Sequence, residues 1–309
     1  MLERLEPTLL RAGGAGLAWC RVRDSIVSPR LSEAFSFHEA LGIVWRDVTS
    51  DVGGCLRKAG VTALFAKGWT LARDYPGLGC RPYGDVDVLV APADHARAAH
   101  ALESAGLDRH VDLHVRWDGL GSSTFHVLHA RSRIVACEGE DLAVLGLEDE
   151  LRYLCVHYAK HGGARPLWLC DVGLAIDSAV VERGFDSARM LCPPSRVRRT
   201  VLAVMNLAVT VLGAREQPCA RGKSPAWLID DTLSTWLHRG LHPVRALAVS
   251  DLRHLPGSLR ERFPNALRAT YALGASYERG PRLPLRVAAF ALRGAELLLE
   301  RLRDEDIER

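Results

Sequence analysis

The sequence has no Cys-x-x-Cys pair, very little lysine and no apolar run long enough to span a bilayer. Its eight cysteines are scattered over 309 residues, so we expect reduced thiols in a cytosolic protein rather than a disulfide framework. The longest apolar run, VLAVMNLAVTVL (201–212), is too short for a membrane span. The opening MLERLEPTLLRAGG lacks the apolar segment of a signal peptide. These absences predict a cytoplasmic protein with no membrane partner.

A basic tract is also missing. The formal net charge is +3 and the isoelectric point is near 8.5, which is too mild to predict nucleic-acid binding. What the chain has instead is 48% hydrophobic and 25% charged residues, a composition typical of a globular protein with a sizeable core.

The hydrophobic pattern predicts an α+β chain in three parts. Residues 1–60 are expected to be helical, with Ser32 capping a helix that Gly60 ends. Residues 61–138 alternate between strands (61–66, 85–90 and 109–117) and helices, including a helix over 91–106 that Asp94 caps. Residues 139–309 read as a helical domain, and we expect strand patterns to stop near 135–147.

Two acids lie inside the expected strand DVDVLV (85–90). Because side chains alternate along a strand, Asp85 and Asp87 share one face, while Val86 and Val88 take the other. Parallel carboxylates repel each other unless a cation lies between them, and hard oxygen ligands suit Mg²⁺. Asp112, in the next strand, is a candidate third ligand. Alternatively, the pair sits at a solvent edge and caps a turn, and spacing alone does not separate the two interpretations.

The turn before these acids has the pattern of a phosphate site. Lys67 and Gly68 lie between a strand and a short helix, where glycine lets the backbone approach a ligand and the first helical amides point outward. Thr70 offers a hydroxyl, and Arg81 offers a guanidinium fork suited to phosphate oxygens. An ordinary turn remains the alternative.

A second group of polar residues follows on a later helix. His157 and His161 are four residues apart and so share a helix face with Lys160 beside them. Asp171 lies in an otherwise apolar helix, where it either orients His161 or Lys160 or pairs with a structural partner. His114 shares the strand face of Asp112 and either lines the site or supports it through a hydrogen bond. A polar helix surface at a domain interface is the alternative for the histidine pair.

Taken together, these motifs resemble the polymerase-β superfamily of nucleotidyltransferases, and more closely a bacterial group of uncharacterised nucleotidyltransferases. The resemblance covers roughly residues 60–180 and is carried by the following motifs: Lys67-Gly68, Tyr75-Pro76, Arg81, Asp85-Val86-Asp87, Asp112-Leu113-His114 and His157 to His161. Trp69 departs from the superfamily pattern, in which a small residue follows the glycine. The resemblance implies a small mixed sheet with flanking helices, followed by a helical domain.

The resemblance also implies an activity. It is the Mg²⁺- or Mn²⁺-dependent transfer of a nucleotide from a nucleoside triphosphate to an acceptor, with release of pyrophosphate. Asp85, Asp87 and Asp112 would hold two metal ions and carry catalysis by a two-metal mechanism, and Lys67, Gly68, Trp69, Thr70 and Arg81 would bind the nucleotide. The acceptor is a small molecule, a peptide or a protein, and nucleic acid is not expected.

Two other interpretations stay open. One is a catalytically inactive nucleotide-binding or scaffold partner of a biosynthetic pathway, which Trp69 favours. The other is a metal hydrolase centred on His157 and His161. His114, His157, Lys160, His161 and Asp171 are expected to line the cleft in the leading interpretation.

Overall fold

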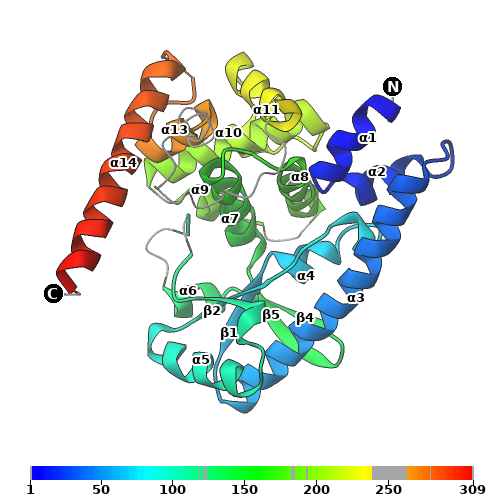
Figure 1. The fold of residues 1–309 in the computed structure, drawn as a ribbon, viewed down its shortest axis with the longest axis vertical. Coiled ribbons are helices and arrows are strands. Elements are labelled where there is room, and N and C mark those ends of the chain that lie inside the picture. Colours follow the sequence, from blue (N-terminus) through cyan, green and yellow to red (C-terminus); the bar gives the residue numbers. More distant parts are fainter. Residues whose placement is uncertain are drawn as a thin grey trace.

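The computed structural model describes residues 2–117, 119–120, 124–181, 185–192, 194–238, 263–278 and 280–307. It shows a small sheet with its own flanking helices and a larger group of helices beside it (Figure 1). The elements of the N-terminal and sheet regions are α1 (Leu2–Arg11), α2 (Ala15–Val22), α3 (Pro29–Lys58), β1 (Ala63–Ala66), α4 (Gly68–Ala72), η1 (Leu78–Cys80), β2 (Val86–Val90), η2 (Pro92–Asp94), α5 (His95–Ser104), η3 (Asp108–His110), β3 (Val111–His114), α6 (Phe125–His129), β4 (Arg133–Cys137) and β5 (Glu140–Val144). The elements of the helical region are α7 (Leu147–Lys160), α8 (Pro166–Val181), α9 (Ser187–Leu191), α10 (Ser195–Leu212), η4 (Pro218–Ala220), α11 (Ala226–His238), α13 (Ala266–Leu273) and α14 (Arg282–Ile307).

The strands form one mixed sheet in the order β3-β2-β1-β5-β4. β1 runs antiparallel to β2, β2 runs parallel to β3, β1 runs parallel to β5, and β4 and β5 form an antiparallel hairpin. The predicted α+β class, with a mixed sheet, flanking helices and a helical C-terminal region, is confirmed.

Each face of the sheet packs against different helices. Val86, Val88 and Val90 of β2 face the core formed with Val52 and Leu56 of α3. On the opposite face, Leu64 and Leu89 pack with side chains that follow β3 or come from α6 and α7, namely Trp117, Phe125, Leu128 and Tyr153. Since Asp87 alternates with the buried valines of β2, it lies on the face that α6 and α7 cover.

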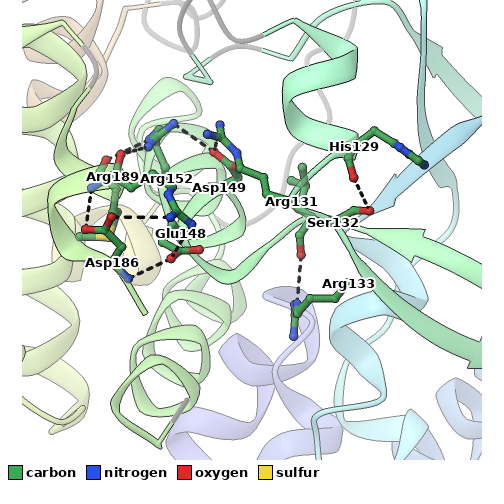
Figure 2. A network of polar contacts seen from close by, with 11 residues as sticks. His129, Arg131, Ser132, Arg133, Glu148, Asp149, Arg152, Asp186 and Arg189 are labelled. Carbon is green, nitrogen blue, oxygen red and sulfur yellow. Dashed lines mark hydrogen bonds and ion pairs between the residues drawn. The ribbon is translucent and has the colours of Figure 1, made fainter. Parts of the chain in front are cut away.

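A polar network fixes the start of α7 (Figure 2). The three acids of its first turn, Glu148, Asp149 and Glu150, are all buried. Four arginines bind these acids, and Figure 2 shows part of the network. The guanidinium groups of Arg131 and Arg152 bind Asp149, the latter through Nη1 at 3.1 Å. Arg133 Nη2 binds Glu150 at 2.7 Å, and Arg189 Nη1 binds Glu148 at 3.4 Å. Acids in a first turn also complement the helix dipole. The network therefore ties α7 to the β4 end of the sheet and to α9.

Three details differ from the sequence expectations. The long helix α3 begins at Pro29, and Ser28 rather than Ser32 accepts the capping hydrogen bond, from the amide of Leu31. Proline favours the first helical position after a serine cap, which explains the earlier start. Asp94 occupies the residue before α5 but makes no capping hydrogen bond. Its carboxylate pairs with Arg97 instead.

The β4–β5 hairpin was not predicted. Its two-residue turn is Glu138-Gly139, both with positive φ (47° and 88°), the conformation that suits the twist of a tight hairpin. The hairpin continues the sheet to Val144, so the predicted core boundary at 138 falls inside that turn. The division into three regions at 60 and 138 stays a prediction.

The cysteines are all free, and only Cys192 is exposed. Within the part of the chain that the structure describes, no helix combines the length and apolar character that a membrane crossing requires.

Candidate active site

Asp87 and Asp112 lie side by side in the sheet. β2 and β3 are parallel, and their register pairs Asp87 with Asp112 and Leu89 with His114. All four side chains therefore share one face. The His114 Nε2 atom lies 3.0 Å from Asp112 Oδ2 and 3.7 Å from Asp87 Oδ1. The expected convergence of Asp87 with Asp112 is thus present, and His114 joins them.

This trio fits a metal ion. One ligand atom from each of Asp87, Asp112 and His114 lies within 4.8 Å of the others. Asp87 is only 1% exposed, and a buried carboxylate requires a compensating positive charge. Asp87 Oδ1 and His114 Nε2 are both buried atoms, and their charged neighbours are Lys67 Nζ, 2.6 Å from the first, and Asp112 Oδ2, 3.0 Å from the second. A divalent cation at the trio would take two carboxylate oxygens and an imidazole nitrogen as ligands, and it would displace the Lys67 ammonium from Asp87.

Asp85 is placed differently. It lies one residue before β2, is exposed, and is not part of the trio. Partial burial, followed by the charge of the nearby Asp87 carboxylate, raises the pKa of Asp85. It remains close enough to feel the charges of both Asp87 and Asp112. A ligand role for Asp85 stays a prediction.

Lys67 supplies positive charge to this cluster. Its Nζ atom lies 2.6 Å from Asp87 Oδ1 and 5.5 Å from the centre of the Tyr153 ring. The Lys67 backbone has φ 50° and ψ −144°, a region that glycine adopts readily and that strains other residues. The structure thus keeps a lysine at a strained position where its ammonium neutralises a buried carboxylate.

The rest of the turn is closely packed. Gly68 has φ 40°, and a Cβ atom there would lie 3.1 Å from the carbonyl oxygen of Asp85. The Trp69 ring is buried in the core shared with α3, so its bulk points away from the cluster. The Thr70 hydroxyl donates to the carbonyl of Lys67 (2.6 Å). Contacts of these residues with a nucleotide stay predictions.

Arg81 and Asp171 form a buried ion pair. Arg81 Nε and Nη2 donate to the two carboxylate oxygens of Asp171 at 2.7 and 2.8 Å, and Nη1 donates to the carbonyl of Gly68 at 3.2 Å. The Tyr75 hydroxyl also donates to Asp171 (2.7 Å). Asp171 therefore has the structural partner that was one of its two predicted roles. The expected contact between Arg81 and phosphate stays a prediction, and it would require the fork to leave Asp171.

A cavity of about 130 Å³ adjoins the trio. Its walls come from the end of β3 with the residues that follow it, and from one face of α7. The lining side chains are His114, Arg116 and Trp117 on the first side, and Tyr153, Val156, His157, Lys160 and His161 on the second. The predicted His157–His161 face of the helix therefore lines a pocket beside the aspartates.

The two helix histidines are packed together against a tryptophan. Their ring centres are 4.5 Å apart, and Trp168 lies 4.7 Å from His157 in an edge-to-face arrangement. Burial, then the positive charge of Lys67, lowers the pKa of His157 to about 2. The pKa of His161, which is more exposed, is also lowered by partial burial and then by Lys160. In the described residues, no third metal ligand joins this pair, which gives the metal-hydrolase interpretation no support.

The neutral state of His157 predicts an acid-sensitive fold. Its folded-state pKa lies below the unfolded value of 6.5, so the unfolded chain binds the extra proton as pH falls below 6.5. This contribution to stability is complete above pH 6.5 and is lost at lower pH, with a slope of about 1.4 kcal/mol per pH unit. Urea unfolding of His157→Gln between pH 5 and 7 should show a shallower pH dependence than the parent chain.

The matched control is His100→Gln, at an exposed position on α5. It should unfold with the pH dependence of the parent chain. Equal slopes for His157→Gln and the parent would contradict a buried neutral imidazole.

Sequence reasoning missed several residues of this region. Tyr75 was noted only as part of the Tyr75-Pro76 motif, and its hydrogen bond to Asp171 was not predicted. Trp117 and Tyr153, whose rings stack at 5.1 Å, carry no local motif. Arg116 follows His114 by two and so continues its strand pattern, which was the one available signal.

Comparison with known proteins agrees with this geometry. The family described as "Uncharacterised nucleotidyltransferase" matches residues 15–112 and 107–213, which together span more than half of the chain. Searches of the curated proteins and of the solved structures each return no match. The chain belongs to this family of uncharacterised nucleotidyltransferases, which is related to polymerase β.

Proposed function

We propose that the protein is a Mg²⁺- or Mn²⁺-dependent enzyme that transfers a nucleoside monophosphate from a nucleoside triphosphate to an acceptor hydroxyl. The observation that carries this proposal is the meeting of Asp87, Asp112 and His114 beside the Lys67–Gly68 turn, in a chain of a nucleotidyltransferase family. Asp87 and Asp112 would hold the metal, with His114 and Asp85 close by.

The reaction makes one bond and breaks another. The acceptor oxygen bonds to the α-phosphorus, the bond from that phosphorus to the bridging oxygen breaks, and pyrophosphate leaves. The chemistry that Mg²⁺ or Mn²⁺ supplies when bound is a lower pKa for the acceptor hydroxyl and neutralisation of charge on the leaving group.

The protein side chains have separate tasks. The Asp112 side chain is 57% exposed, so it can accept the proton of the acceptor hydroxyl as general base. His114, 3.0 Å from Asp112, holds that carboxylate in place. The Lys67 ammonium, at present on Asp87, is long enough to turn to a phosphate oxygen when a metal takes over its carboxylate.

The catalytically inactive alternative loses its main support. It rested on Trp69, which was expected to disturb a phosphate site next to Gly68. Because the Trp69 ring lies in the core on the α3 side of the sheet, it does not cover the turn. We therefore favour the active enzyme.

The direct test is incubation with each α-labelled nucleoside triphosphate, Mn²⁺ or Mg²⁺, and a panel of small molecules, peptides and proteins. We expect pyrophosphate release together with transfer of the label to an acceptor. Pyrophosphate release that is independent of added metal, or none with any nucleotide, would contradict the proposal.

Lys67 predicts a competition between an ammonium and a metal ion. In Lys67→Met the buried Asp87 carboxylate loses its counterion, which destabilises the metal-free protein. A divalent cation then stabilises the variant more than the parent, because binding no longer displaces the ammonium. Thermal unfolding over a Mn²⁺ titration should show a lower starting Tm for Lys67→Met and a larger rise.

Lys58→Met is the control for this titration, because Lys58 is exposed at the end of α3. It should follow the parent curve. An identical Mn²⁺-dependent rise in all three proteins would show that Lys67 and the metal do not share Asp87.

A further inference from the structure

The cavity beside the trio has an unusual lining. Among the residues that the structure describes, its polar lining groups are imidazoles, an indole, a phenol and two cations, with no carboxylate. Arg116 and Lys160 are exposed, which places their charges at the rim. A ligand that matches this lining is rich in hydrogen-bond acceptors and carries negative charge.

The inner wall contains an unused donor. The Trp117 ring is only 4% exposed, and its Nε1 atom is buried without a hydrogen-bond partner in the described part of the chain. An indole N–H can only donate, and a buried donor without a partner costs free energy. A ligand oxygen that entered beside the Trp117 ring would satisfy it.

The size and walls of the cavity suit a ring. A cavity of about 150 Å³ in another protein accommodates benzene, and the volume here is about 130 Å³. Trp117 and Tyr153 stack at 5.1 Å with an interplanar angle of 22°. His157 adds a third flat, uncharged side chain, so a six-membered ring can pack against the walls.

The position of the cavity separates it from the phosphate turn. Ala66, Asp87 and Asp112 are neighbours across the three strands, and the Lys67–Gly68 turn follows Ala66 directly. β1 runs antiparallel to the other two strands. From Asp112 onward, β3 therefore runs away from the turn, toward His114, Arg116 and Trp117. The backbone of the turn and the cavity thus lie at opposite ends of the trio, and only the Lys67 side chain extends from the turn toward the cavity, with Nζ 5.5 Å from the centre of the Tyr153 ring.

This arrangement matches the geometry of phosphoryl-type transfer. The attacking and leaving oxygens lie roughly in line on opposite sides of the phosphorus. With the leaving pyrophosphate at the turn, the acceptor must approach from the side of the cavity. Resting on the proposed function, we propose that the cavity is the acceptor site, and that it takes a ring-sized hydroxy compound with an oxyanion group, its hydroxyl beside Asp112 and its anion at Arg116 and Lys160.

The anion is either a carboxylate or a phosphate monoester, and one set of titrations distinguishes them. The probes are 4-hydroxybenzoate and ribose 5-phosphate, with 4-hydroxybenzamide and ribose as neutral counterparts. Calorimetry on the full chain with Mn²⁺ and a non-hydrolysable ATP analogue should show binding of at least one anionic probe and weaker binding of its neutral counterpart.

Variants locate the binding. Arg116→Gln and Lys160→Gln should each raise the dissociation constant of the anionic probe about tenfold, since a charge-assisted contact of this kind contributes about 1.4 kcal/mol or more. Trp117→Phe removes the indole donor but keeps a ring. It should weaken binding of an anionic probe and of its neutral counterpart alike. Arg109→Gln, at an exposed arginine that does not line the cavity, should bind like the parent.

A parallel titration with the Mn²⁺–ATP analogue alone keeps the two proposals apart. Binding of the analogue without binding of either anionic probe overturns the acceptor site but leaves the proposed function standing. If Arg116→Gln and Lys160→Gln weaken binding of the analogue and leave binding of the probes unchanged, the cavity binds the nucleotide, and the acceptor assignment is wrong. Failure of the analogue to bind counts against the proposed function itself.

Discussion

Asp87→Asn should abolish nucleotidyl transfer while leaving the fold intact. The asparagine has nearly the same shape as the aspartate, but it removes the one fully buried charge of the trio. A catalytic metal contributes several kcal/mol of transition-state stabilisation, and each 1.36 kcal/mol is tenfold in rate. We therefore expect the rate of pyrophosphate release to fall by at least about 10³-fold.

Two measurements distinguish a loss of catalysis from a loss of the fold. Far-ultraviolet circular dichroism should match that of the parent chain, and the Mn²⁺-dependent rise in Tm should disappear. Asp141→Asn, at an exposed acid at the start of β5, is the matched control and should keep full activity. Full turnover in Asp87→Asn would refute the metal assignment, and the same substitution at Asp85 tests whether that residue is a ligand.

Arg81→Met should produce the largest loss of stability. The side chains of Arg81 and Asp171 are 6% and 1% exposed, and the substitution leaves the Asp171 carboxylate buried without its cation. Removing one partner of a buried ion pair typically costs about 3–5 kcal/mol. Urea denaturation should show a loss of this size, because Tyr75 is the one partner among the described residues that remains bonded to Asp171.

A double variant separates the pair from its surroundings. Arg81→Met with Asp171→Leu replaces both charges by apolar groups and should recover part of the lost stability, since a buried pair is often replaced at little cost. Arg57→Met breaks the solvent-exposed pair with Glu140, and it should change stability far less. Similar losses for Arg81→Met and Arg57→Met would contradict a structural role for the buried pair.

The sequence was sufficient to predict the acid cluster for a physical reason. Alternation along a strand fixes which residues share a face, so Asp87 and Asp112 could be matched before their register was known. The turn at Gly68 was visible because glycine marks a positive φ, which the structure has there. Asp85 shows the limit of this reasoning, since β2 begins one residue later at Val86.

The remaining features depend on contacts between distant residues. Arg81 and Asp171 are 90 residues apart, and no local pattern distinguishes an arginine that binds phosphate from one that binds a buried carboxylate. The β4–β5 hairpin was missed because RIVAC and EDLAV are short and the second begins with two acids. Its Glu-Gly turn was the signal that could have revealed it.

The lining positions on α7 and its C-cap fall on one helical face, since each has a partner three or four residues away: Tyr153, Val156, His157, Lys160 and His161. A single helical stripe thus forms one whole wall of the cavity, while the acids stand on separate strands and the arginine network anchors the helix at its other end. In the proposed function, this stripe would contribute to the choice of acceptor, and the acids of β2 and β3 would carry the bond chemistry. On that proposal, a relative that modifies another molecule would arise by exchanging side chains along this stripe, with the acids left unchanged.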